Sequence, residues 1–486
     1  MELSEEIRNK YQPVIGLEIH AQMLTKTKAY SNDKNEYGSA PNTNVSPITL
    51  GHPGTLPRMN TKTIDFAIKM GLACGSDIAP EQHFARKNYF YPDLPKGYQI
   101  TQDTTPICTG GEIVVKDADG NDKVINVTRI HMEEDAGKSI HDIDPFNTLI
   151  DLNRAGVPLI EIVSEPDIRT SQEAYNYVTE VRKLVRYLDI CDGNMEEGSL
   201  RCDANISVML KGADKYGVRV EVKNMNSIRN VQRAIEHEIT RHIIAIENGE
   251  QLFQETRNFD ALKGTTTAMR SKEAANDYRF FPEPDLQPIK ITEDKIKSLQ
   301  AEMPPLPAAL FAKYTKELGL SEYDAQLLTD QKEIALYFEA IIEHTKNYKA
   351  AVNWLMGDVK SYLNTNAIGI AEFPISAKNI AGLIALIDEG KISNNLASQK
   401  VFPAMLTENS TALQVAEAND WIQNSDENAI IEIIKAVFDE NPEEFERFKA
   451  GEQKLMGFLM GKVMQKSKGK ADPKSASKLI NQLSKS

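Results

Sequence analysis

The sequence predicts an α+β domain with an antiparallel sheet, followed by an all-α helical domain and a small helical tail domain. Three observations predict this order. Strand and helix patterns are mixed between residues 13 and 290. Strand patterns nearly vanish after the proline-rich breaks at 279–288 and 303–307, and a last helical unit begins near residue 408. The expected domains are residues 1–293, 294–406 and 407–486.

Three segments of the first domain alternate between apolar and polar residues, as strands with one buried face do. They are 14–23, 200–209 and 218–222, and the short connection between the last two predicts an antiparallel hairpin. The polar residues that face away from the core include Glu18, His20, Arg201, Asp203, Glu221 and Lys223. A solvated sheet face alternates in the same way without any function, and this reading stays open.

Two helices are also well marked in this domain. One begins at a capping pair, Thr170 and Glu173, and its apolar residues recur at helical spacing as far as Leu188. The other runs from Ile228 and stops at Gly249.

The composition limits the class of protein. Hydrophobic residues make up 41% and charged residues 26%, which is typical of a globular protein. The net charge of −14 would repel nucleic acid, so a polyanionic partner must meet a local basic patch. None of the four cysteines form a CxxC pair, which argues against a zinc site or a disulfide framework. With no signal-peptide pattern and no apolar run of about 18 residues, the expected location is cytoplasmic, without membrane contact.

Several polar residues are of the types that bind a metal ion. Glu18 and His20 project side by side, about 6–7 Å apart along the strand. A carboxylate and an imidazole on a rigid strand suit a divalent ion. Magnesium prefers oxygen ligands, so His20 would be a partial or unusual ligand.

Four further segments concentrate carboxylates and cationic residues: 84–93, 131–139, 151–167 and 195–203. The second ends in Gly-Lys-Ser, but the glycine that a P-loop needs five positions earlier is Met132. Lys138 could still contact phosphate, and an acidic surface turn is an equal alternative. The first segment interleaves basic and aromatic residues, as a nucleotide or a single-stranded RNA end requires, although core packing explains its tyrosines equally well. Together the segments supply the carboxylates and cations that phosphoryl transfer needs.

The C-terminal region differs from the rest of the chain in charge. From residue 451 onward there are eight lysines and two acidic residues, and 454–466 has the pattern of an amphipathic helix. The residues expected to contact an RNA backbone are Lys462, Lys466, Lys468 and Lys470. A solvated lysine-rich tail is the alternative.

Seven segments, taken in order, resemble the B subunit family of aspartyl/glutamyl-tRNA(Asn/Gln) amidotransferases. They are 14–20, 86–93, 131–138, 151–154, 161–167, 195–203 and 277–285, and the match runs from residue 13 to the end of the chain. The resemblance implies a cradle-like catalytic domain, then a helical domain, then a tail that contacts tRNA.

The resemblance also implies an ATP-dependent carbon–nitrogen ligase with glutamine as amido donor. Mischarged Glu-tRNA(Gln) or Asp-tRNA(Asn) is bound, and its side-chain carboxylate is phosphorylated by ATP with Mg²⁺. Ammonia then displaces phosphate, which gives Gln-tRNA(Gln) or Asn-tRNA(Asn). The ammonia comes from a separate amidase (A) subunit, and a small C subunit completes a heterotrimer. The sequence has no amidase signature, which agrees with this division. The alternative is a non-catalytic, tRNA-positioning subunit of the same complex.

The resemblance assigns roles residue by residue. The magnesium positions are Glu18, His20, Glu134 and Glu161. Glu134 and Glu161 are also the expected catalytic carboxylates, with Asp203 and Glu221 as further candidates on the adjoining hairpin. We infer from their charge, and not from the resemblance, that Lys87, Lys138, Arg201 and Lys223 clamp ATP phosphates or the aminoacyl end. Many members bind zinc through cysteines after the first strand, but residues 30–50 contain none. No zinc is therefore expected, and this loop must be held by packing and hydrogen bonds.

Overall fold

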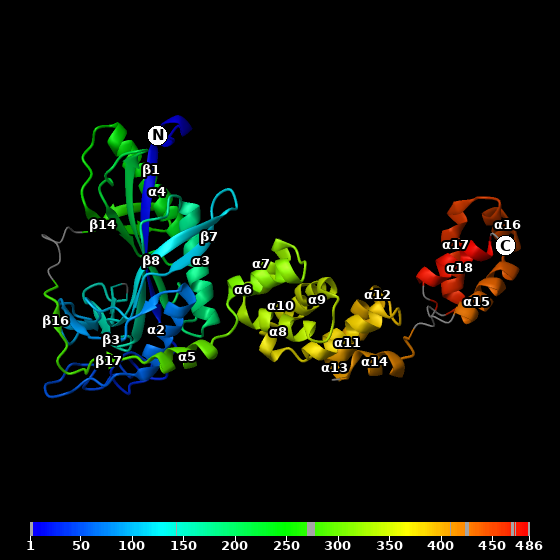
Figure 1. The fold of residues 1–486 in the computed structure, drawn as a ribbon, viewed down its shortest axis with the longest axis horizontal. Coiled ribbons are helices and arrows are strands. Elements are labelled where there is room, and N and C mark those ends of the chain that lie inside the picture. The colour runs from blue at the N-terminus through cyan, green and yellow to red at the C-terminus, as the bar shows by residue number, and fades with distance from the viewer. Residues whose placement is uncertain are drawn as a thin grey trace. The chain divides into compact units, whose positions relative to one another are not determined.

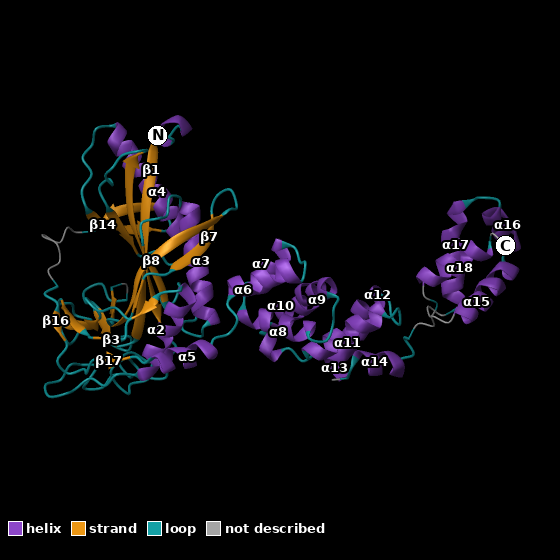
Figure 2. Ribbon diagram, viewed as in Figure 1, coloured by secondary structure: helices purple, strands orange, loops and turns teal. Residues whose placement is uncertain are grey.

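The computed structural model describes residues 3–141, 143–269, 278–408, 410–422, 427–467, 471 and 473–484. The chain divides into two compact units, Met1–Pro307 and Ala308–Ser486 (Figure 1). Each unit has its own architecture, and the predicted α+β region followed by a helical region is confirmed (Figure 2).

A single large sheet forms the first unit. Among the described residues it has 13 strands, and its main path runs β15-β14-β13-β12-β1-β11-β8-β5-β4-β16. These strands are β1 (Tyr11–Gln22), β4 (Ala85–Asn88), β5 (Tyr98–Thr101), β8 (Asp122–Glu134), β11 (Pro158–Ser164), β12 (Leu200–Leu210), β13 (Val220–Lys223), β14 (Glu255–Asp260), β15 (Thr265–Ala268) and β16 (Phe281–Pro282). The pairs along this path are antiparallel except β13 with β14, which is parallel.

Shorter strands complete the first unit. Three join the large sheet beside β8: β2 (Asp77–Ile78), β6 (Cys108–Thr109) and β7 (Glu112–Lys116). Two small sheets pair β9 (Lys138–Ile140) with β10 (Leu149–Asp151), and β3 (Glu81–Gln82) with β17 (Ile289–Lys290).

Helices cover one face of the sheet. They are α2 (Thr61–Cys74), α3 (Ser171–Tyr187), α4 (Ile228–Glu247) and α5 (Glu293–Ala301), and the short α1 (Glu5–Arg8) precedes β1. As the capping pair predicts, Thr170 Oγ1 accepts a hydrogen bond from the Glu173 amide at 3.1 Å. The apolar side of α3 packs with Ile15, Leu17 and Ile19 of β1 in one core. Because side chains alternate along a strand, the polar residues of β1 face away from these helices.

The second unit is helical. Its α-helices are α6 (Pro307–Ala312), α7 (Glu322–Thr329), α8 (Lys332–Ile342), α9 (Tyr348–Trp354), α10 (Lys360–Asn366), α11 (Ala377–Asp388), α12 (Asn394–Leu396), α13 (Phe402–Glu408), α14 (Ala412–Ala418), α15 (Glu427–Glu440), α16 (Pro442–Lys449), α17 (Met456–Lys466) and α18 (Pro473–Leu483). Short π turns at Lys313–Glu317, Leu355–Val359 and Ala397–Val401 and 3₁₀ turns at Ile370–Glu372 and Gln453–Leu455 adjoin them.

The expected domain boundaries lie at two of these elements. The first boundary falls at the start of α5, which packs on α2, and Leu299 of α5 is buried in the core of the first unit. The second falls inside α13. Residues 430–480 form a core of their own, with Ile434, Val463 and Ile480 fully buried. The three-domain division stays a prediction.

No helix within the described part of the chain combines the length and the hydropathy that crossing a membrane requires.

Candidate functional site

Acidic, imidazole and cationic side chains gather on the sheet face that the helices leave uncovered. The strand register places His20 of β1 opposite Glu161 of β11, and Glu18 opposite Asp203 of β12. Directly opposed residues project to the same side of a sheet. Side chains predicted from separate segments therefore share one surface, and they form two clusters.

The first cluster, which we call the histidine cluster, consists of His20, Glu133 and Glu161. The Nε2 atom of His20 lies 3.5 Å from Glu133 Oε1 and 3.6 Å from Glu161 Oε2. One potential ligand atom from each residue lies within 4.8 Å of the others. Both carboxylates are buried, with exposed fractions of 4% and 8%. Buried carboxylates that converge on an imidazole are suited to hold a cation.

Neighbouring imidazole and ammonium groups lower the pKa of the buried carboxylate of Glu161. Burial alone would raise the pKa of Glu161, but His20 and a hydrogen bond from His131 lower it well below its usual value. The Nε2 atom of His131 lies 3.0 Å from Glu161 Oε2. Lys87 of β4 lowers the pKa of Glu161 further, so its ammonium group acts on this cluster.

Glu134 lies on the opposite face of β8 from Glu133, outside the histidine cluster. Its Oε1 atom accepts a hydrogen bond from the Ile100 amide at 2.9 Å and forms an ion pair with Lys96. The resemblance implied a metal-binding role for Glu134, and the structure places Glu133 beside His20 instead. The alternation of β8 contains the signal that separates the two glutamates. Glu134 takes the same face of the strand as the apolar Ile130 and Met132, whereas Glu133 takes the other face.

The second cluster, which we call the hairpin cluster, consists of Glu18, Asp203 and Glu221, with Lys223 beside them. Lys223 Nζ lies 2.5 Å from Asp203 Oδ2 and 2.8 Å from Glu221 Oε1. Asn205 Nδ2 donates a hydrogen bond to Glu18 Oε1 at 2.8 Å. One potential ligand atom from each of the three carboxylates lies within 4.8 Å of the others.

The two clusters influence each other through Glu18. Burial is the main cause that raises the pKa of Glu18, and the charges of Glu161, Glu221 and Asp203 raise it further. Burial would lower the pKa of Lys223, but Asp203 and Glu221 outweigh it and raise that pKa. The face thus holds more negative charge than its own cations balance, which favours a bound cation.

Arg201 is held in place by Asp135 at the end of this face. The two side chains form two contacts, of 2.7 Å and 3.2 Å, and Gln22 Nε2 donates to the same carboxylate at 2.8 Å. Arg154 Nε lies 3.7 Å from Asp135 Oδ2. Burial would raise the pKa of Asp135, but Arg201 and Arg154 keep it lowered. These ion pairs hold the guanidinium groups of Arg201 and Arg154 beside the adjoining pocket.

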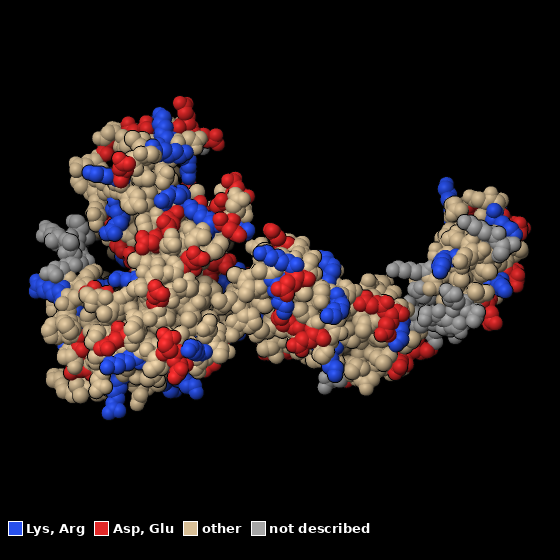
Figure 3. All heavy atoms as spheres, viewed as in Figure 1, with Lys and Arg blue, Asp and Glu red and all other residues tan. Residues whose placement is uncertain are grey.

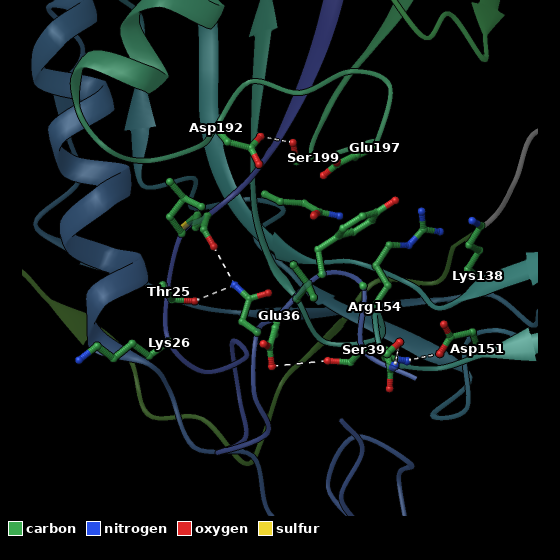
Figure 4. A pocket seen from close by; sticks show the side chains of 18 residues that line it. Thr25, Lys26, Glu36, Ser39, Lys138, Asp151, Arg154, Asp192, Glu197 and Ser199 are labelled. Atoms are coloured by element: carbon green, nitrogen blue, oxygen red, sulfur yellow. Dashed lines mark hydrogen bonds between the residues drawn. The ribbon is translucent and has the colours of Figure 1, made fainter. Parts of the chain in front are cut away.

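A pocket of about 470 Å³ continues the polar face beyond β1. Gln22, two residues after His20 and on the same side of the strand, belongs to its wall. Figure 4 shows Lys138 and Arg154 along one side of the pocket, with Asp192 and Glu197 along another. This volume is within the range of small-molecule sites. Segment 35–39 and Asp192, which the sequence did not mark as parts of a nucleotide site, supply part of the wall, whereas Glu197 and Ser199 belong to the predicted segment 195–203.

The lysines predicted for the tail lie in the second unit. Lys462 Nζ lies 5.6 Å from the ring centroid of Phe458, and Lys466 forms an ion pair with Glu440. Lys468 and Lys470 lie outside the described residues. Contact of these lysines with tRNA stays a prediction. Figure 3 shows the mixed charges on one side of the described surface.

The loop between β1 and α2 is held by hydrogen bonds around two residues. Asp33 Oδ2 accepts from the Ser46 amide at 3.0 Å and from the hydroxyls of Ser46 and Thr49. The fully buried Lys28 donates from Nζ to the Asn44 carbonyl at 2.7 Å. An anionic and a cationic side chain thus tie together this cysteine-free loop.

The variant Lys28→Met is expected to remove a pH dependence of stability. Burial lowers the pKa of Lys28 to about 8, below its value in the unfolded chain of about 10.4. Between these values the unfolded chain binds a proton that the folded chain does not, so the wild-type free energy of unfolding rises with pH. The full rise across both pKa values is about 3 kcal/mol, and about 2 kcal/mol of it falls between pH 7.5 and pH 9.5. Urea unfolding at pH 7.5 and pH 9.5 measures it, and parallel profiles for both proteins would refute the expectation.

Comparison with known proteins supports the resemblance along the whole chain. The GatB/GatE catalytic domain family matches residues 13–297, and the GatB domain family matches residues 336–483. Three similar relatives are each named as the B subunit of an aspartyl/glutamyl-tRNA(Asn/Gln) amidotransferase. The relative from Synechococcus sp. (strain JA-2-3B'a(2-13)) is 46% identical over 487 residues, which cover 99% of both chains. That from Thermodesulfovibrio yellowstonii is 47% identical over 97% of this chain and 98% of its own, and that from Gloeothece citriformis is 47% identical over 98% of each. The chain therefore belongs to the family of tRNA-dependent amidotransferase B subunits.

Proposed function

We propose that this chain carries the ATP-dependent step of the amidotransferase. In this step the side-chain carboxylate of Glu-tRNA(Gln) or Asp-tRNA(Asn) is phosphorylated and then amidated. One observation carries the proposal. Carboxylates, an imidazole and cations from segments far apart in the sequence converge on one sheet face, and that face adjoins a pocket large enough for a nucleoside.

The donor atoms of the histidine cluster fit a divalent cation. Glu133 and Glu161 offer the oxygen atoms that magnesium prefers, and His20 is the weaker third ligand. When bound there, magnesium supplies positive charge to the phosphate oxygens as the acyl phosphate forms. The hairpin cluster is an all-oxygen group whose charge Lys223 already reduces, so it is the less favourable of the two.

The pocket beside Gln22 is the proposed site of the nucleotide. Lys138 and Arg154 provide cations for the phosphate oxygens, and Asp192 and Glu197 provide acceptors for ribose hydroxyls. The Arg154 guanidinium already donates to the carbonyls of Ala136 and Gly137, so it needs little reorganisation on binding. We place the triphosphate along the polar face toward the histidine cluster, because Gln22 of the pocket wall lies two residues after His20 on the same side of β1.

The substrate carboxylate requires cations near these acidic side chains. Lys87 and Lys223 flank the two clusters and are the proposed contacts of the aminoacyl end. A carboxylate oxygen attacks the γ-phosphorus, and ADP leaves. Ammonia then attacks the acyl carbon, and phosphate leaves as the amide forms. In the proposed heterotrimer, glutamine hydrolysed in an amidase (A) subunit supplies the ammonia, and a small C subunit holds the pair together.

The proposal is tested by conversion of Glu-tRNA(Gln) to Gln-tRNA(Gln) in the complex with both partner subunits. Ammonium chloride replaces glutamine, so the amidase reaction is bypassed, and Asp-tRNA(Asn) is assayed in parallel. Conversion is expected to require ATP and magnesium, and to fall at least about tenfold in Glu18→Gln because a cluster carboxylate is lost. Glu112→Gln, on the exposed face of β7, is the matched control.

Full conversion by Glu18→Gln, His20→Ala and Glu161→Gln would contradict the proposal. The chain would then be a tRNA-positioning subunit, and the ATP site would lie in a partner.

A further inference from the structure

A row of aromatic rings lies beside the histidine cluster. It consists of Tyr91, Tyr89, Tyr278 and Phe280, and we call it the aromatic ladder. Successive ring centroids are 6.0 Å, 6.1 Å and 6.1 Å apart, with the ring planes inclined to one another. The end rings are nearly half exposed to solvent, since the exposed fraction is 47% for Tyr91 and 44% for Phe280. Core packing, the alternative that the sequence left open for the tyrosines, does not account for exposed end rings.

The two halves of the ladder are fixed to each other through the backbone. The Asn88 amide donates to the Tyr278 carbonyl at 2.9 Å, and Asn88 Nδ2 donates to the Arg279 carbonyl at 2.7 Å. Arg279 has a φ of 41°, a left-handed conformation that is costly for a residue with a side chain. Asn88 thus holds a strained turn that sets Tyr278 and Phe280 side by side. A ladder fixed before binding loses little conformational entropy when a ligand binds.

Lys87 connects the ladder to the histidine cluster. Its Nζ atom lies 4.8 Å from the ring centroid of Tyr278, and its charge acts on Glu161. Tyr89 is influenced by the same acidic groups. Burial is the main cause that raises the pKa of Tyr89, and the charges of Glu133 and Asp135 raise it further. Both ends of the ladder are therefore partly exposed to solvent, and its middle borders the residues proposed for catalysis.

We propose that the aromatic ladder binds the unpaired 3′-terminal nucleotides of the tRNA by stacking their bases. A row of rings that is exposed at both ends and lies beside a cation is suited to single-stranded RNA, because every base has a face that stacks on an aromatic side chain. The ladder then leads the 3′-terminal aminoacyl group past Lys87 to the acidic clusters. The inference rests on the proposed function for the identity of the RNA.

The adenine of ATP and a partner protein are the other candidate occupants. The pocket beside Gln22 already provides an enclosed volume for one nucleoside, whereas the ladder is open and longer than a single base requires. Continuity with the proposed site of the aminoacyl end favours RNA over a protein surface.

The test uses the full chain in its complex and a tRNA with 2-aminopurine in place of its 3′-terminal adenine. Stacking quenches the fluorescence of 2-aminopurine, so the wild type is expected to quench it on binding. The double variant Tyr91→Ala/Phe280→Ala is expected to lose most of the quenching and to bind the tRNA about tenfold more weakly. The variant Tyr91→Leu/Phe280→Leu keeps apolar bulk without a ring and should lose the quenching as well.

The matched control is Tyr216→Ala, an exposed tyrosine between β12 and β13, toward the other edge of the sheet. It should quench like the wild type. A tRNA without its unpaired 3′ nucleotides should bind the wild type and the double variant equally.

Undiminished quenching in both ladder variants would overturn the proposal. If saturating ATP reversed the quenching, the ladder would be assigned to the nucleotide instead. If a ladder variant lost a partner subunit but still quenched the fluorescence, the ladder would be assigned to a protein interface. Normal quenching without ATP-dependent amidation would support base stacking on the ladder and refute only the proposed function.

Discussion

The variant Glu133→Gln is expected to lower ATP-dependent amidation by on the order of a hundred- to a thousandfold. The substitution keeps the shape of the side chain but removes one charge from the histidine cluster. Glu133 Oε1 and Glu161 Oε2 both lie within 3.6 Å of His20 Nε2, so a cation held there loses half of its carboxylate charge. Single-turnover conversion of Glu-tRNA(Gln) with ammonia measures the chemical step, and a filter-binding assay with the same tRNA is expected to show unchanged affinity.

Glu134→Gln is the matched control, one residue further along β8 and on its other face. Its carboxylate pairs with Lys96 and accepts from the Ile100 amide, so the variant is expected to lose stability more than chemistry. A lower temperature of unfolding with nearly normal single-turnover rates is the expected result. If Glu134→Gln abolished amidation while Glu133→Gln did not, the role that the resemblance implies for Glu134 would hold, and the histidine cluster would lose its proposed role.

The variant Glu238→Gln is expected to reduce the free energy of unfolding of the first unit by about 3–5 kcal/mol. Glu238 of α4 is fully buried, and its carboxylate accepts hydrogen bonds from Thr266 and from Arg241, the latter at 2.7 Å. Arg257 Nε lies 3.4 Å away. With an amide in place of the carboxylate, both arginines remain beside a neutral group that cannot balance their charge. Urea unfolding followed by circular dichroism measures the loss.

The effect of Glu238 should also depend on pH. Burial would raise the pKa of Glu238, but the neighbouring His242 and hydrogen bonds from Arg241 and Thr266 outweigh it and lower the pKa to about 2. A carboxylate whose folded pKa is depressed stabilises the fold above its unfolded pKa of about 4.3, and this contribution is lost as the pH falls toward the folded value. The difference between wild type and variant should therefore shrink between about pH 4.5 and pH 2. A constant difference across this range would contradict the assigned charge state.

The sequence was sufficient for the features that depend on local pattern. Alternation in 14–23 and 200–209 predicted which residues share a face, and the register pairs Glu18 with Asp203 and His20 with Arg201. The hairpin between the strands of Asp203 and Glu221 is confirmed as antiparallel. These predictions succeed because the period of a strand is fixed by backbone geometry.

The parts of the site that the sequence did not predict depend on pairing between distant segments. Whether Glu133 or Glu134 meets His20 is decided by the register of β8 on β11, and a shift of one residue would exchange the two faces. The proximity of Tyr278 to Tyr89 likewise depends on hydrogen bonds between β4 and a segment about 190 residues later. The alternation within β8 indicates which face each of its side chains takes, but the identity of the partner segment leaves no periodic trace in either segment alone.

The place of β1 at the centre of the sheet has a consequence for biosynthesis. This strand emerges from the ribosome before its two neighbours, β11 and β12, which end only at residues 164 and 210. At about 5–20 residues per second, β1 waits roughly ten to forty seconds for its second partner. During that time both of its edges can pair with other chains. The polar side chains of Glu18 and His20 lie on one face of β1, so this face is not continuously apolar. They therefore also disfavour aggregation of the nascent chain.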